Sequence, residues 1–333
     1  MGCDTYASQT RGTVPAHCRR SARSVEYDHR SAAPGGCAHH IHRSEAQYTR
    51  RILPEGDRRR TRMKLLAIIE DTIREGIARK TIIGFFILST LFLLIGIIAA
   101  ISIDTESMFQ AQQIPDEQGK MITVEMTKLI QSGIVGTINF FAIIISVFAT
   151  ASIIPHTVEK GAIDLLLSKP VSRLTYLTGK SIGAVLIVLA NVAYFVIGMW
   201  LILSIKTGSW EPGILVSILT ITYSFAVLYT VLLLIGVTSG STPLSIITVY
   251  VYLFLINPII EAREIIAQAT KNDTVKYVLD GLYYILPKPG ELRDIAVNVI
   301  FSRPIDWEPV FTSLAFGAAL FALSAYIFQK KDF

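Results

Sequence analysis

The chain has 333 residues, of which 51% are hydrophobic and only 17% are charged. Soluble domains contain about 25% charged residues, so this composition argues against a soluble enzyme and against a disordered chain. Three cysteines cannot form a disulfide framework. The composition is therefore typical of a membrane protein.

The basic excess of the chain is confined to residues 1–62, which hold 12 Arg, no Lys and six acidic residues. This stretch contains no apolar run that could act as a secretory signal. Its low hydrophobicity and its Arg, Ser, Gly and Pro content predict disorder. We expect a non-functional extension here, in preference to a metal site at Cys37, His39, His40 and His42. Residues 63–333 carry 19 basic and 20 acidic residues, which argues against nucleic-acid binding.

Long uncharged windows follow, and a spanning helix needs about 20 apolar residues. Four windows match one span each, whereas the window 212–260 is long enough for two. That window contains the run Thr238–Pro243, which predicts a tight turn between two spans. The sequence thus predicts an all-α membrane protein with six transmembrane helices, near 81–103, 134–155, 181–205, 214–237, 243–260 and 309–328.

The distribution of Lys and Arg predicts the orientation of these spans. The segments 63–80, 156–180 and 329–333 together hold ten Lys or Arg in 48 residues, whereas the segments on the other side hold nine in 86. Basic residues in short loops favour the cytoplasm. We therefore expect both termini and the 156–180 loop to be cytoplasmic.

Shorter amphipathic helices are expected beside the spans. Leu65, Ile69, Ile73 and Ile77 recur every four residues, which predicts an N-terminal helix lying in the membrane interface. The segment 261–308, in the outer loop between spans 5 and 6, has apolar spacing that predicts one or two short amphipathic helices. Asn257-Pro258 is expected to end span 5.

Several polar residues fall within the predicted spans. In-span amides such as Asn139 and Asn191 bond across helices or line a pathway, and the first is commoner. The pair Gly179-x-x-x-Gly183 permits close helix contact at the start of span 3. Span 4 is unusually polar, and its hydroxyl groups either line a pathway or bond to carbonyls of their own helix.

Motifs for catalysis are missing from the sequence. There is no G-x-x-x-x-G-K-[ST] phosphate-binding loop and no G-x-S-x-G, and residues 63–333 contain no Cys and one His. The predicted spans carry no ionisable residue, although ion-coupled carriers usually have one. We expect no catalytic residue, cofactor or metal, and energy supplied by another subunit.

The cytoplasmic segment 156–180 is the most informative part of the sequence. Its residues 158–168 can form a short helix with Glu159 in the first turn, where the helix dipole favours an acid. Lys169-Pro170 ends that helix and Ser172 is a plausible N-cap for the next one. A soluble partner that pushed on such an element would move two spans together.

This segment resembles the signature loop of ABC type-2 permeases, the membrane subunits of ATP-binding-cassette exporters. The matching residues are Glu159-Lys160-Gly161, the run 165–173 and Gly179-Lys180. The resemblance extends over residues 63–333 and is greatest to the copper-processing-type and unknown-substrate permeases. It implies a plasma (inner) membrane exporter subunit whose loop docks on a cytoplasmic ABC ATPase, which binds the ATP.

The resemblance also implies which side chains face the ATPase subunit. By position they are Glu159, Lys160, Asp164, Lys169 and Arg173. The alternative is that these charges only solvate and orient a membrane-surface loop. A second permease subunit, identical or not, is implied as a further partner beside the lipid bilayer. The rival functions are a secondary, ion-coupled transporter and a membrane anchor that transmits ATPase motion to an outer partner.

Overall fold

The computed structural model describes residues 63–78, 80–102, 117–153, 155, 172–270 and 273–331. These residues form helices joined by short turns, and no strand occurs among them. The predicted all-α class is therefore confirmed. The predicted disordered extension, residues 1–62, lies outside the described residues.

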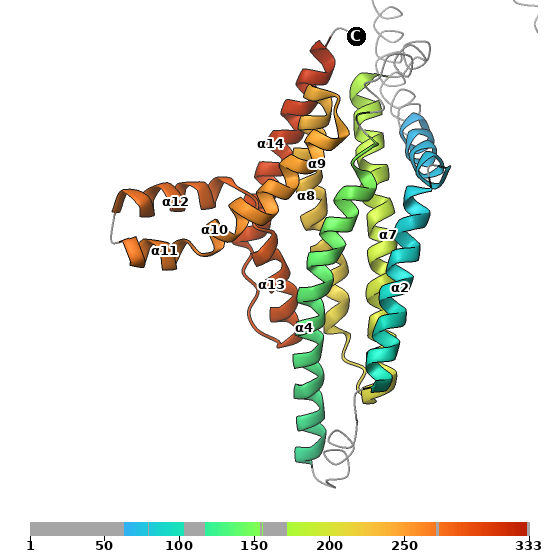
Figure 1. Ribbon diagram of the computed structural model, residues 1–333, viewed down its shortest axis with the longest axis vertical. Coiled ribbons are helices and arrows are strands. Elements are labelled where there is room, and N and C mark those ends of the chain that lie inside the picture. The colour runs from blue at the N-terminus through green and yellow to red at the C-terminus, as the bar shows by residue number, and fades with distance from the viewer. Residues whose placement is uncertain are drawn as a thin grey trace, which may run out of the picture. The chain divides into compact units, whose positions relative to one another are not determined.

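The long helices run alongside one another (Figure 1). They are α2 (Thr81–Ser102), α4 (Glu117–Thr150), α7 (Arg173–Thr207), α8 (Val216–Ser239), α9 (Thr242–Val251) and α14 (Glu308–Lys330). Five stretches of helix are apolar and long enough to cross a membrane, namely Val124–Thr150, Arg173–Thr207, Pro212–Ser239, Thr242–Glu261 and Glu308–Lys330. A sixth span results if the helix Met63–Ala78 and the segment Ile82–Ile98, which meet at 68°, are counted as one bent span.

The boundaries of α7 follow from its sequence. The Ser172 side chain accepts a hydrogen bond from the Thr175 amide, which confirms the predicted N-cap. At the other end Gly208 has φ of 69°, the left-handed conformation that glycine adopts without cost. The helix therefore begins eight residues before the predicted span, since its cap rather than its first apolar residue decides the start.

The predicted span at 134–155 is displaced in the structure. Helix α4 begins at Glu117, and its candidate span is Val124–Thr150. It ends at Thr150, where residues 151–153 form a turn and the Ile153 amide donates to the Thr150 carbonyl at 3.1 Å. This tighter bond, over three residues, closes the helix.

The prediction that Asn257-Pro258 ends span 5 is wrong. The helix passes from α9 through a π-helical turn, η3 (Tyr252–Ile256), into α10 (Asn257–Glu261). A wider turn before the proline accommodates the missing amide hydrogen, so the chain continues as a helix. By contrast, the turn predicted within 238–243 is present, because α8 ends at Ser239 and Gly240 has φ of 65°.

Three helices separate the fifth and sixth spans. They are α11 (Arg263–Thr270), α12 (Asp273–Ile285) and α13 (Pro289–Ile300). The pair α11 and α12 extends sideways from the long helices (Figure 1). Helix α13 instead packs against α8 and α4 and has six buried residues. The predicted amphipathic helices are thus present, but one of them belongs to the core.

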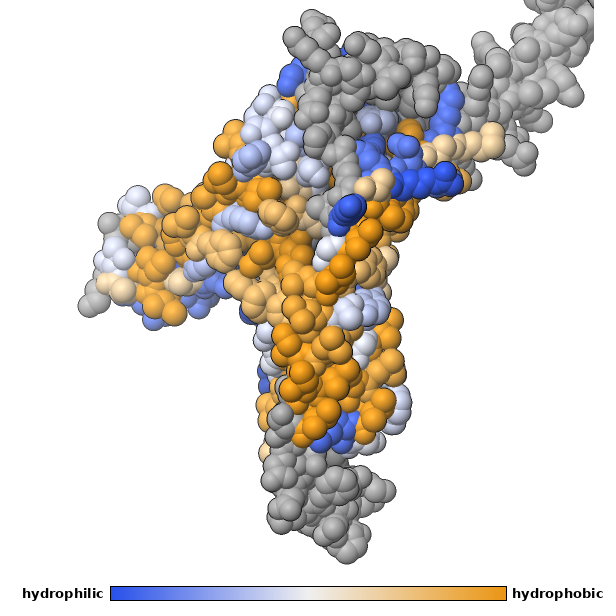
Figure 2. Space-filling view, turned by 45° about the vertical axis from the view of Figure 1, so that its right-hand side comes forward, coloured by the Kyte–Doolittle hydropathy of each residue, from blue (hydrophilic) through white to orange (hydrophobic). Residues whose placement is uncertain are grey.

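Helix α8 forms the centre of the core, in contact with α14, α9, α7, α13 and α4. Its side chains Phe225, Leu232 and Leu233 are fully buried. A short 3-10 helix, η2 (Pro212–Leu215), leads into it. Outward-facing side chains of the long helices are large and apolar, and Figure 2 shows broad hydrophobic areas over them. This pattern is expected of helices surrounded by lipid.

Candidate functional site

The predicted docking residues divide into two groups. Glu159, Lys160, Asp164 and Lys169 lie outside the described residues, and Arg173 is the first residue of α7. The structure therefore shows where the segment re-enters the bundle. That point, together with the elements packed around it, is the candidate site.

Arg173 contacts the end of another span. Its Nη1 donates to the carbonyl oxygens of Phe328, Gln329 and Lys331, at 3.4, 3.2 and 2.9 Å. The last carbonyls of a helix have no partner within the helix, and a cation near them also complements the helix dipole. Arg173 thereby ties the start of α7 to the end of α14.

Lys331 repeats this arrangement on the neighbouring helix. Its Nζ donates to the carbonyl oxygens of Val237 and Thr238, at 2.8 and 3.2 Å, in the last turn of α8. Three spans are consequently connected at one end of the bundle by two basic side chains. A displacement of Arg173 would act on α14 directly and on α8 through Lys331.

A buried lysine lies two turns further along α7. The Lys180 side chain is 2% exposed, forms an ion pair and hydrogen bond with Glu75, and lies 3.7 Å from the Asp71 carboxylate. Both acids belong to the helix Met63–Ala78. A buried charge is tolerated only when it is paired, so this contact joins that helix to α7.

Small residues bring the same two helices close together. An ideal Cβ placed on Gly179 would lie 2.7 Å from Ile68 Cγ2, and one on Gly183 would lie 2.8 Å from Thr72 Cβ. Neither position has room for a side chain. The close contact predicted from Gly179 and Gly183 is present, and its partner is the helix Met63–Ala78.

The polar side chains of span 4 mostly bond to their own helix. Thr222 and Thr230 donate to the carbonyls of Ile218 and Val227, both at 2.7 Å. Tyr223 donates to the Val310 carbonyl at 2.6 Å and so crosses to α14. The sequence left two roles open for these hydroxyls, bonding to carbonyls or lining a pathway. The observed hydrogen bonds favour the first.

Some buried polar atoms of the described bundle have no hydrogen-bond partner. They include Asn139 Oδ1, Asn191 Nδ2 and Tyr229 OH. Asn191 Oδ1 accepts from Ser89 Oγ at 2.9 Å, which bonds α7 to α2 across the helix interface. In-span asparagine at this position therefore acts as a contact between helices.

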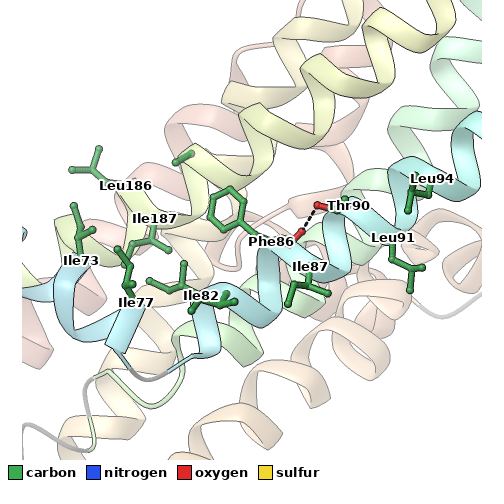
Figure 3. Close-up of a pocket in the computed structure, with 12 residues that line it drawn as sticks. Ile73, Ile77, Ile82, Phe86, Ile87, Thr90, Leu91, Leu94, Leu186 and Ile187 are labelled. Carbon is green, nitrogen blue, oxygen red and sulfur yellow. Dashed lines mark hydrogen bonds between the residues drawn. The ribbon is translucent and has the colours of Figure 1, made fainter.

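A groove of about 760 Å³ lies between the helix Met63–Ala78, α2 and α7 (Figure 3). Eleven of its twelve lining residues are apolar. The exception, Thr90, donates to the Phe86 carbonyl at 2.8 Å and shares a hydrogen bond with the Tyr194 hydroxyl at 3.1 Å. Thr90, the polar side chain of this lining, is already hydrogen-bonded. The groove is therefore better suited to a hydrocarbon chain than to a charged or polar ligand.

A second charged cluster holds α12 against the bundle, at the opposite end of the fifth span. Arg263 Cζ and Lys288 Nζ lie 3.4 and 3.5 Å from the centroid of the Tyr283 ring. The Tyr283 hydroxyl donates to Glu291 at 3.0 Å. Burial, followed by this hydrogen bond, raises the pKa of the Tyr283 phenol above its ordinary value.

Comparison with protein families identifies the chain. Residues 66–333 match the model of the ABC-2 family transporter protein, which covers the whole helical bundle. The chain belongs to the ABC-2 transporter family. A search of curated proteins finds no match.

Family membership makes the chain a multi-pass membrane permease, a transport component that is typically not itself catalytic. It implies association with an ABC ATPase and with membrane lipid. Among the residues that the structure describes, no group of three or more His, Cys, Asp or Glu side chains is suited to hold a metal ion.

Sequence reasoning missed two functional contacts of this ABC-2 permease. Lys180 was part of the matched motif, but its partners are about a hundred residues away in the sequence, for Glu75 a separation of 105. Lys331 belongs to the basic C-terminal segment, and nothing in its sequence neighbourhood indicates that its Nζ contacts the carbonyls of α8. A sequence signal for the Lys180 contact does exist. Asp71 and Glu75 lie four residues apart and so share one helix face, and Lys180 lies between Gly179 and Gly183, which allow close helix packing.

Proposed function

We propose that this chain is the membrane subunit of an ABC exporter in the plasma (inner) membrane. The segment 156–180 docks on a cytoplasmic ATPase subunit, which binds and hydrolyses the ATP. A second permease subunit, identical or not, completes the pathway. Both termini of the permease lie on the cytoplasmic side, as the distribution of Lys and Arg favours.

One observation carries the proposal, namely the contacts of Arg173 at the point where the docking segment enters the bundle. Arg173 holds the last carbonyls of α14, and Lys331 holds those of α8. A force applied by a soluble partner to the preceding segment would therefore reach three spans. A loop that only solvated the membrane surface would not need such connections.

The packing of the core supports a pathway between two subunits. Helix α8 contacts five other helices and buries side chains such as Phe225 and Leu232 completely. A polar cargo crossing within one subunit would have to displace these side chains. The outward faces of the spans, by contrast, carry exposed apolar side chains that a second subunit could cover.

The docking role is tested by reversing one charge, Glu159→Lys. If Glu159 contacts the ATPase, this variant inserts in the membrane normally but retains about tenfold less ATPase on purification, a change typical of losing one interfacial charge pair. The measurement is the ratio of ATPase to permease after affinity purification from solubilised membranes. Glu264→Lys serves as the matched control because Glu264 is 78% exposed on α11, in the segment 261–308 that the sequence places on the outer side.

Three results would overturn the proposal. A full ATPase complement bound to Glu159→Lys would remove Glu159 from the interface. Labelling of a cysteine introduced at Ser168 by an impermeant thiol reagent in intact cells would place the segment outside. Transport that persists without ATP and collapses with an uncoupler would instead identify an ion-coupled carrier.

A further inference from the structure

Lys180 differs from the other charged residues of α7 in its burial. Its side chain is 2% exposed, whereas those of its partners Glu75 and Asp71 are 29% and 72% exposed. Its Nζ also lies 5.7 Å from the centroid of the Tyr176 ring. The lysine thus reaches from α7 to two acids at the edge of the neighbouring helix. Removing both acids would leave a buried charge uncompensated.

The surrounding surfaces fix the position of this ion pair. Gly179 and Gly183 lie one residue before and three residues after Lys180, and both contact the helix Met63–Ala78 at distances that exclude a side chain. On that helix, Ile68, Thr72 and Gly76 form the face toward α7. This face is offset by one residue from the predicted apolar stripe, whose members Ile73 and Ile77 line the groove in Figure 3.

The helix Met63–Ala78 changes direction sharply where it joins the next span. It meets the segment Ile82–Ile98 at 68°, and Lys80 at the bend has φ of 60°. A left-handed backbone conformation is unfavourable for an L-residue other than glycine. At Lys80 it marks a change of chain direction. The helix is therefore joined to two elements, to α7 through the Lys180 contact and to α2 through the bend at Lys80.

We propose that Lys180, together with Glu75 and Asp71, is a latch that makes the helix Met63–Ala78 and α7 move as one body. The proposal rests on the proposed function, because it assigns the latch to the span that follows the docking segment. When that segment is displaced, α7 carries the helix with it, and the bend at Lys80 passes the motion to α2. Lys180 is a positioning residue, which acts through the helices it joins.

The first test measures whether the latch holds the helices together without any ATPase. Spin labels at Ala67 and Ile182, both exposed, report the distance between the helices in reconstituted permease whose three native cysteines are replaced by serine. We expect one narrow distance distribution for the parent, and a distribution about twice as broad for Lys180→Met. Lys128→Met is the control, since the ion pair that Lys128 forms among the described residues is with Glu125 of its own helix. An equally narrow distribution for Lys180→Met would overturn the latch.

The second test distinguishes joint motion from a merely structural contact. Ile68→Cys removes the Cγ2 and Cδ1 atoms that fill the space beside Gly179, so that Gly179→Cys fits in the double variant. The two Cβ positions lie 3.0 Å apart, and a disulfide between them requires the helices to move apart slightly, to a separation of about 3.5–4.5 Å. In the purified permease–ATPase complex, we expect Lys180→Met to lower ATP hydrolysis about tenfold. Forming the disulfide in that variant should restore it, because the bond replaces the latch.

The outcomes separate the latch from the proposed function. Loss of ATP hydrolysis on forming the disulfide in the otherwise normal protein, with recovery on reduction, would show that the helices must separate and would overturn the latch. Failure of any ATPase to co-purify with the parent would overturn the proposed function instead. In that case the spin-label distances still decide whether Lys180 holds the two helices together.

Discussion

Arg173 shows how one side chain can join two spans at their ends. The carbonyl oxygens of Phe328 and Gln329 in α14, and of its C-cap Lys331, lie within 3.4 Å of the Arg173 Nη1. Arginine suits this role because its guanidinium is always charged and presents several donors in a fixed plane. A lysine at the same position would supply the charge but not this geometry.

Replacing this arginine should loosen the last turn of α14. Arg173→Ala removes a charged donor from carbonyls that then lack a partner, at a cost of about 2 kcal/mol. Amide hydrogen exchange in the last turn of α14 should accelerate more than tenfold, and Arg173→Lys should give an intermediate rate. Arg303→Ala, which removes a guanidinium 5.1 Å from the Phe301 ring, is the control. Unchanged exchange in Arg173→Ala would contradict the role in joining the two helices.

The Tyr283 cluster gives a prediction about pH. Because the pKa of Tyr283 is raised in the folded protein, the neutral phenol is favoured by folding. Its contribution is complete below its unfolded pKa of about 10 and is lost as the pH rises through the folded value. Protection of α12 from hydrogen exchange should therefore weaken above about pH 10.

The matching variant is Tyr283→Phe, which keeps the ring beside Arg263 and Lys288 but removes the hydroxyl that donates to Glu291. We expect this variant to be less stable by about 1 kcal/mol at neutral pH. Its α12 should also lose less protection from hydrogen exchange as the pH rises, because no phenol is left to ionise. An identical alkaline profile in both proteins would show that the Tyr283 phenol does not cause the pH dependence.

At the scale of elements, the contact between α7 and the helix Met63–Ala78 depends on small residues. Gly183→Leu would place a side chain where Thr72 now lies, so the two helices would have to separate. We expect a loss of about 2 kcal/mol and release of the Lys180 pair, seen as faster cleavage of the helix by protease in detergent.

Gly84→Leu provides the comparison for this substitution. A Cβ at Gly84 meets no atom within 4 Å, so leucine there should be tolerated and should favour the helix by about 0.5–1 kcal/mol. Equal sensitivity of the two variants to protease would mean that close packing at Gly183 is not what holds the helix.

The elements differ in how far their boundaries could be predicted from sequence. The Ser172 cap and the turn before Pro243 depend on nearby residues, and both occur as predicted. The end of span 5 does not occur at Asn257-Pro258 as predicted, because a π-helical turn before Pro258 lets the chain continue as a helix. The extra helix α13 was recognised as a helix, yet its burial depends on contacts with α8 and α4.

At the scale of the molecule, the fold was predictable because uncharged windows of about 20 residues have few alternatives to membrane-spanning helices. The candidate site was predictable only in part. Arg173 was named from the motif, but its partners Phe328 and Lys331 lie more than 150 residues away in the sequence. Long-range pairings of this kind require the arrangement of the spans, which hydropathy does not give.

The position of Lys331 has a practical consequence for anyone purifying the permease. The Lys331 side chain binds carbonyl oxygens at the end of α8. An affinity tag fused after Phe333 would begin three residues after Lys331. A bulky or acidic tag there could compete with the carbonyls of Val237 and Thr238 for the ammonium group. A cleavable tag, removed before measurement, leaves the hydrogen bonds from Lys331 to Val237 and Thr238 without a competing group.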